Sequence, residues 1–250
     1  MNKAIHRSFK FLLGFIVSIA TLNSIAQVSA QDFIAYQAAM EDAIYLKKSN
    51  VYDGLISITK ANKDLIWKTV NGEDYVLMLS LKGSSVKYYE PYLNWGFFNT
   101  GDWPVWVTAA PQLLNFMKKE NAKDVNMRLK QLLGLPPSSV YTHFVELWVK
   151  PSDLFRPCLD SEITDKTCEL CFPSTADSTY KAWINNTRLS RYYPDPCGLM
   201  NEYPWTCLGY TYDWNMKNKT HVGMSEFVIP SYRNVVVNGI YTIEEYLKKK

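Results

Sequence analysis

The sequence predicts an α+β fold in which helices flank a central, mostly antiparallel sheet. Three observations support this class. Apolar residues recur at helical spacing in several segments, an almost unbroken apolar run occupies residues 75–81, and residues 151–223 are rich in Cys, Pro and aromatic residues with little periodicity. We therefore expect a single domain over residues 31–250. Its parts are a regular core at 31–150, a disulfide-stabilised loop region at 151–223, and closing strands with a terminal helix at 224–250.

The first part of the core predicts one helix followed by several strands. Residues 31–49 carry apolar side chains at helical spacing. Asn71-Gly72 is a strong hairpin-turn signal, and the apolar run at 75–81 suits a central strand covered on both faces. The same reasoning predicts further strands at residues 51–59, 65–70, 85–89 and 104–109.

Two more helices and a last group of strands follow. Pro111 can open one helix at its first turn, and Asp124 can cap a second helix that ends at Gly134. Residues 140–149 alternate along a strand that is apolar on both faces. Shorter patterns predict a helix at 177–186, strands at 225–229 and 234–237, and a terminal helix at 242–249.

The N-terminus has the order of a secretory signal. Lys3, Arg7 and Lys10 precede an apolar run at 11–22, and small residues end the segment at Val28-Ser29-Ala30. The apolar run is about 12 residues long, which is short of the ~20 that a membrane-spanning helix needs. We therefore expect a signal peptide over residues 1–30 and an exported protein, secreted or periplasmic, without a membrane span; the alternative is an N-terminal membrane anchor.

The charge balance argues against a polyanionic partner. The chain has 27 Lys and Arg against 24 Asp and Glu, and the three basic residues before position 30 account for the whole excess. The remainder is formally neutral, so it lacks the basic surplus typical of nucleic-acid binding. No motif predicts a cofactor.

All five cysteines lie in the loop region. Cys158 and Cys168 are ten residues apart, as are Cys197 and Cys207, and export would place them in an oxidising compartment. We expect these two disulfides, which leaves Cys171 free. Cys168 and Cys171 also form a C-x-x-C pair, so a thiol–disulfide active site is an alternative. A zinc site is still less favoured, because it needs four ligands and the number of cysteines is odd. No metal site is assigned.

Acidic residues suggest a possible catalytic set. Paired carboxylates cleave glycosidic bonds, and Asp213 and Glu226 with His221 are the candidates for such a hydrolase. A second acidic group crowds residues 153–169, where calcium binding is an alternative to an ordinary solvated loop, although the spacing does not match an EF-hand.

Aromatic residues suggest a binding cleft. The densest run covers residues 203–214, and Tyr and Trp pair an apolar ring with a polar tip. The favoured hypothesis is a binding protein for a glycan or a peptide; a hydrolase comes second and a disulfide-stabilised structural or interaction protein third. The residues expected to line the cleft are Trp183, Trp205, Tyr210, Tyr212 and Trp214.

Overall fold

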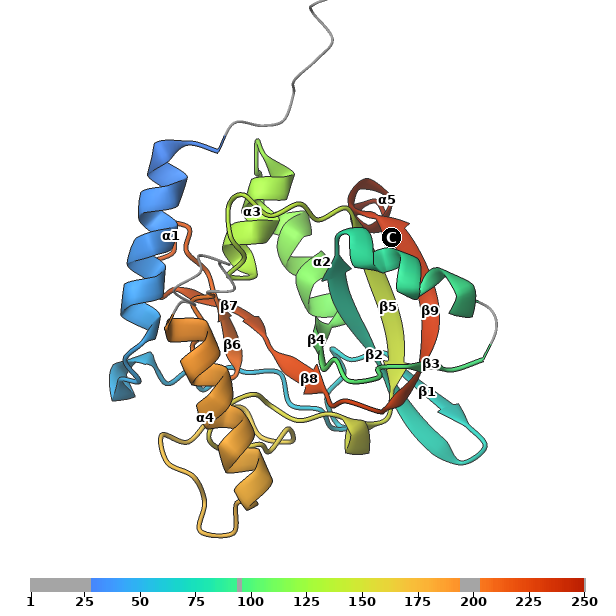
Figure 1. Cartoon of the computed structure of the whole chain (residues 1–250). Coiled ribbons are helices and arrows are strands. Elements are labelled where there is room, and N and C mark those ends of the chain that lie inside the picture. The colour runs from blue at the N-terminus through green and yellow to red at the C-terminus, as the bar shows by residue number, and fades with distance from the viewer. Residues whose placement is uncertain (1–27, 94–95, 194–202, 250) are drawn as a thin grey trace, which may run out of the picture.

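The computed structural model describes residues 28–93, 96–193 and 203–249. In this part of the chain, seven strands form a curled antiparallel sheet with the order β3-β9-β5-β2-β4-β8, and β1 pairs with β2 (Figure 1). The expected α+β class with a central antiparallel sheet is thereby confirmed. The strands of the sheet are β1 (Trp67–Val70), β2 (Glu73–Lys82), β3 (Phe98–Asn99), β4 (Val105–Ala109), β5 (His143–Val149), β8 (Phe227–Ile229) and β9 (Asn234–Thr242).

A two-stranded ribbon lies beside the sheet. It pairs β6 (Tyr210–Tyr212) with β7 (Val222–Ser225), and β7 leads almost directly into β8. The helices are α1 (Ala30–Ala43), α2 (Ala110–Lys119), α3 (Val125–Leu132), α4 (Ser178–Tyr192) and α5 (Ile243–Leu247). Short 3-10 helices cover Lys48–Asn50, Ser84–Tyr88, Glu90–Tyr92 and Pro151–Asp153.

Local signals explain where these elements begin and end. Asp124 caps α3 by accepting a hydrogen bond from the Met127 amide, and Thr242 forms a capping box with Glu245 on α5. Asn71 and Gly72 both have positive φ, as the tight turn between β1 and β2 requires. The predicted hairpin turn and the predicted cap at Asp124 are therefore confirmed.

Strand β2 is covered on both faces, as its unbroken apolar run predicts. Val76 and Met78 pack into one core cluster with residues of β4, β5, β8 and β9. Leu77 and Leu79 point to the other face, where α2, α3 and α5 cover the sheet. The alternation of a strand places successive side chains on opposite faces, so both must be apolar here.

Two predicted strands are wrong. Residues 84–88 form a 3-10 turn that buries Val86 and leads into buried Tyr89, which are three residues apart and therefore share one helical face. Residues 51–59 form no strand, because their backbone hydrogen bonds to residues 163–166 lack the regular spacing of a sheet. The Leu55 amide donates to the Lys166 carbonyl, and the Ile58 amide donates to the Ile163 carbonyl. Strand β6 lies in the aromatic run and was not predicted.

The aromatic run at 203–214 is packed beneath two helices. Helix α1 contributes Tyr36 to a cluster with Trp214, and α4 contributes Ile184 and Tyr192 to a cluster with Trp205. Both helices lie on the side of the molecule that carries β6 and β7, away from α5 (Figure 1). The predicted signal segment lies outside the described residues, except for its last three. Within the described ranges, no helix has the length and apolar character needed to cross a bilayer.

Candidate functional site

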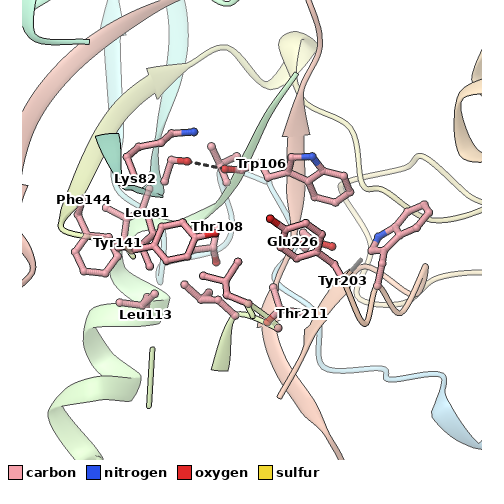
Figure 2. A pocket seen from close by; sticks show the side chains of 18 of the residues that line it. Leu81, Lys82, Trp106, Thr108, Leu113, Tyr141, Phe144, Tyr203, Thr211 and Glu226 are labelled. Carbon is pink, nitrogen blue, oxygen red and sulfur yellow. Dashed lines mark hydrogen bonds between the residues drawn. The ribbon is translucent and has the colours of Figure 1, made fainter. Parts of the chain in front are cut away.

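A cavity of about 560 Å³ opens beside the ends of β2 and β4 (Figure 2). The sheet forms one wall through Ser80 to Lys82 and Trp106 to Thr108. The other wall comes from residues 203–205, 211–212 and Glu226, with the segment 133–141 closing a third side. Its volume matches that of cavities that hold small organic ligands.

Aromatic side chains form much of the lining. The rings of Trp106 and Trp205 meet edge to face with centroids 5.9 Å apart, and both border the cavity. Tyr141 and Tyr203 also line it, as Figure 2 shows. Trp103 lies at the edge of the cavity and remains 80% exposed. Such a lining suits a ligand with a flat or apolar body and polar groups around it.

Glu226 is the only carboxylic acid in the described lining, and its environment is unusual. It sits between β7 and β8, and its amide donates a hydrogen bond to the carbonyl of Gly209. Its Oε2 atom and Nε1 of Trp205 are both buried, and neither has a hydrogen bond of ordinary geometry to the residues that the structure describes. Burial raises the pKa of Glu226 to about 8, although the charge of Arg191 and the indole of Trp205 act in the opposite direction. At neutral pH this carboxyl group is therefore mostly protonated.

Lys82 is a cation on the same lining. It ends β2, and its ammonium lies 5.4 Å from the ring centroid of Tyr89, which is buried. Burial lowers the pKa of Lys82 to about 8. No carboxylate forms an ion pair with it in the part of the chain that the structure describes.

Arg191 adds a second cation near the two tyrosines. It lies in the last turn of α4, with its guanidinium 4.8 Å from the ring centroid of Tyr203. Burial and a hydrogen bond with Tyr203 raise the pKa of Tyr141 above its ordinary range, so this phenol stays neutral. Within the described lining, two cations therefore accompany one carboxyl group that is held mostly neutral.

Of the five aromatic residues expected to form the cleft, two line the cavity and three do not. Trp205 and Tyr212 line the cavity. Trp183 does not line it, but packs against Trp106, Trp205, Phe155 and Tyr180. Tyr210 is buried and donates its hydroxyl to the Asn50 carbonyl, while Trp214 is buried and donates its indole N–H to the Leu135 carbonyl. These last two rings serve the core.

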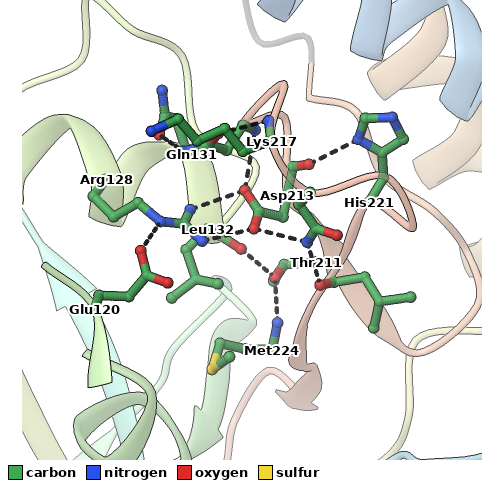
Figure 3. A network of polar contacts seen from close by, with 12 residues as sticks. Glu120, Arg128, Gln131, Leu132, Thr211, Asp213, Lys217, His221 and Met224 are labelled. Carbon is green, nitrogen blue, oxygen red and sulfur yellow. Dashed lines mark hydrogen bonds and ion pairs between the residues drawn. The ribbon is translucent and has the colours of Figure 1, made fainter. Parts of the chain in front are cut away.

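Asp213 lies away from the cavity, in a buried polar network (Figure 3). Both of its carboxylate oxygens accept hydrogen bonds from the Arg128 guanidinium, at 2.9 and 2.8 Å. Arg128 also binds Glu120 at 2.8 Å, and Asn218 donates to Asp213. Because Asp213 is fully buried and doubly bound, the structure does not bring it together with Glu226 as a pair facing one cleft.

His221 belongs to the same network. Its Nδ1 lies 3.0 Å from the Asp213 carbonyl oxygen, and its ring stacks on Tyr212 with centroids 4.8 Å apart. It lines neither this cavity nor a second one of about 900 Å³ that includes Arg128 and Glu120. The position of His221 therefore suits a structural contact.

The cysteines follow the prediction in part. Cys158 and Cys168 form a disulfide with Cα atoms 6.4 Å apart. Among the described residues, the exposed Cys171 and the buried Cys207 have no disulfide partner. The predicted partner of Cys207, Cys197, lies outside the described residues, so that pairing stays a prediction.

The acidic loop around the disulfide is organised by an arginine. Arg156 is completely buried, and its guanidinium donates to the Asp165 carboxylate at 2.5 Å and to carbonyls of Ile56, Thr167 and Asp165. The loop therefore has its own internal cation. Among the described residues, no group of three or more His, Cys, Asp and Glu side chains is arranged to hold a metal ion.

Sequence reasoning missed several residues of the cavity. Lys82 follows an apolar run directly, and a charge at the end of a buried strand is a signal that could have been followed. Tyr141, Arg191 and Trp106 carry no such signal, because only the folded chain brings them beside Glu226. No protein-family model, curated protein or solved structure matches this chain. The chemistry of the cavity must therefore carry the functional assignment.

Proposed function

We propose that the protein is an exported binding protein whose cavity holds a carboxylate-bearing ligand with a ring or apolar body. The observation that carries the proposal is the charge of the lining: Lys82 is cationic and forms no ion pair with a described carboxylate, whereas Glu226 is mostly protonated at neutral pH. An anion would pair with the buried ammonium, and the protonated carboxyl group can donate a hydrogen bond. Both ligand classes that the sequence favours, glycans and peptides, include such carboxylates.

Export is part of the same proposal. It rests on the signal pattern over residues 1–30 and on the disulfide between Cys158 and Cys168, which is typical of an oxidising compartment. The hydrolase alternative has less support. Glu226 has the raised pKa of a general acid, but Asp213 is bound by Arg128 away from the cavity. No second carboxyl group in the described lining can take its place.

The test is a calorimetric titration with matched charged and uncharged compounds. Galacturonic acid and N-acetylphenylalanine carry the carboxylate, whereas galactose and N-acetylphenylalaninamide lack it. We expect the acids to bind at pH 7 and their uncharged counterparts to bind at least tenfold more weakly. Binding should also weaken above pH 8, where Lys82 loses its proton and Glu226 gains a negative charge.

A matched pair of variants tests whether the acids bind in the cavity or elsewhere on the surface. Lys82→Met should weaken binding of the acids at least tenfold. Lys87→Met should leave it unchanged, because Lys87 also lies over a tyrosine ring but is exposed and outside the cavity. Equal binding of acids and uncharged compounds, unchanged binding in Lys82→Met, or no binding of any of the four would overturn the proposal.

A further inference from the structure

Trp103 is an exposed side chain at the edge of the cavity. It borders the cavity and yet is 80% exposed, and in the described part of the chain its indole makes no ring contact. Isolated surface aromatics need no explanation by themselves. This one differs because it adjoins a site that already has an aromatic lining, so a ligand leaving the cavity on that side would meet its ring.

The backbone beneath Trp103 is held firmly. Its amide donates to the Thr100 carbonyl, and the turn at 99–103 is joined to the turn at 230–233 by hydrogen bonds in both directions. The Thr100 amide donates to the Arg233 carbonyl at 2.9 Å, and the Tyr232 amide donates to the Gly101 carbonyl at 2.8 Å. Side chains add to this, since Tyr232 donates its hydroxyl to Asp102. A ligand that covers this ring therefore does not have to order the turn that carries it.

The same hydrogen bonds say which class of ligand fits. An extended peptide is recognised largely through its main chain, which needs free backbone amides and carbonyls on the protein. Here most of those amides are already used within the two turns. Amides that donate inside the pair belong to Thr100, Gly101, Trp103, Tyr232 and Arg233. The rim therefore offers a flat indole face and few free amides, and a flat face suits the ring of a sugar.

We infer that the ligand is an acidic glycan chain whose end enters the cavity while its next sugar ring stacks on Trp103. This deepens the proposed function and rests on it: the cavity holds the acidic end unit, and Trp103 forms an outer subsite. Covering part of the indole face removes enough apolar surface from water for roughly a tenfold gain in affinity. The rim would thus distinguish a chain from a single sugar.

The experiment compares galacturonic acid with its α-1,4-linked trimer by calorimetry at pH 7. We expect the trimer to bind about tenfold more tightly than the monomer. Trp103→Ala should remove that gain, so that trimer and monomer bind with similar affinity, whereas Trp103→Phe should keep most of it. Tyr45→Ala is the matched control, because Tyr45 is 67% exposed but lies outside the cavity; it should change neither affinity.

The outcomes separate the inference from the proposed function. Equal affinities of monomer and trimer, or a Trp103→Ala variant that weakens both equally, would overturn the outer subsite while the cavity remains a binding site. A gain with length for N-acetylated tripeptides ending in phenylalanine over N-acetylphenylalanine, lost in Trp103→Ala, would overturn the choice of a glycan. Failure of every acid to bind would overturn the proposed function itself.

Discussion

The buried carboxyl group of Glu226 should give the protein a distinctive dependence of stability on pH. Its pKa is about 8 in the folded chain against an ordinary value of 4.5. Between these two values the folded state keeps a proton that the unfolded state releases. The contribution of this group to stability is therefore fully present below pH 4.5 and is lost as the pH rises through 8. The loss by pH 7 is about 3 kcal/mol, because each unit of pKa difference corresponds to about 1.4 kcal/mol and the folded group still holds most of its proton at that pH.

Glu226→Gln keeps the shape of the side chain and removes the titration. The variant should therefore gain stability relative to the natural chain as the pH rises. We expect the difference in the free energy of unfolding, variant minus natural chain, to increase by roughly 2–3 kcal/mol from pH 5 to pH 7.5. Urea denaturation followed by far-ultraviolet circular dichroism at half-unit pH steps measures it. The control is Glu244→Gln, because the Glu244 side chain is 77% exposed on α5 and its profile should run parallel to that of the natural chain. A parallel profile for Glu226→Gln as well would refute a neutral, buried Glu226.

Four further changes test other parts of the structure by the same denaturation assay. Lys82→Met should abolish a rise in stability between about pH 8 and 10.5, since the lowered pKa of this lysine makes the folded chain release a proton that the unfolded chain keeps. Arg128→Ala should cost about 3–5 kcal/mol, because it leaves a fully buried carboxylate unpaired; a cost below 1 kcal/mol would contradict this. Arg156→Ala should cost a similar amount and make the disulfide loop an early site of limited proteolysis, which an unchanged digestion pattern would disprove. Lys249→Met should lower the free energy of unfolding by about 2–4 kcal/mol, because Lys249 binds buried Glu146 at 2.6 Å. Lys248→Met breaks an exposed pair and should lower it by less than about 0.5 kcal/mol. Equal losses in the two variants would show that the buried pair contributes nothing.

Much of the fold could be predicted because its signals are local. The apolar run of β2, the turn at Asn71 and the cap at Asp124 each depend on residues within a few positions of one another. The predicted strand at 85–89 is wrong because Val86 and Tyr89 are compatible with a strand as well as with a 3-10 turn over so short a range. Only tertiary packing decides between the two.

The site was predicted less well than the fold, and two buried acids show why. Asp213 and Glu226 stand beside aromatic residues in the sequence and are equivalent as candidates there. In the folded chain, Arg128 reaches Asp213 from a helix 85 residues away and neutralises it. Among the described residues no arginine binds Glu226 in this bidentate way, and burial keeps its pKa raised despite the charge of Arg191. What distinguishes a structural acid from a titratable one is therefore a contact across the fold, which a local pattern does not contain.

The two ionisable groups that define the cavity come from different halves of the chain. Lys82 ends a strand of the regular core, and Glu226 follows the loop region, so neither half carries the charge pattern alone. The sequence placed function in the Cys- and aromatic-rich half, where periodicity is missing. That half supplies Trp205 and Tyr212 to the lining, but the rigid sheet supplies the opposite wall and its cation. A loop-rich wall set against a sheet edge is the general arrangement of sites that a regular scaffold positions.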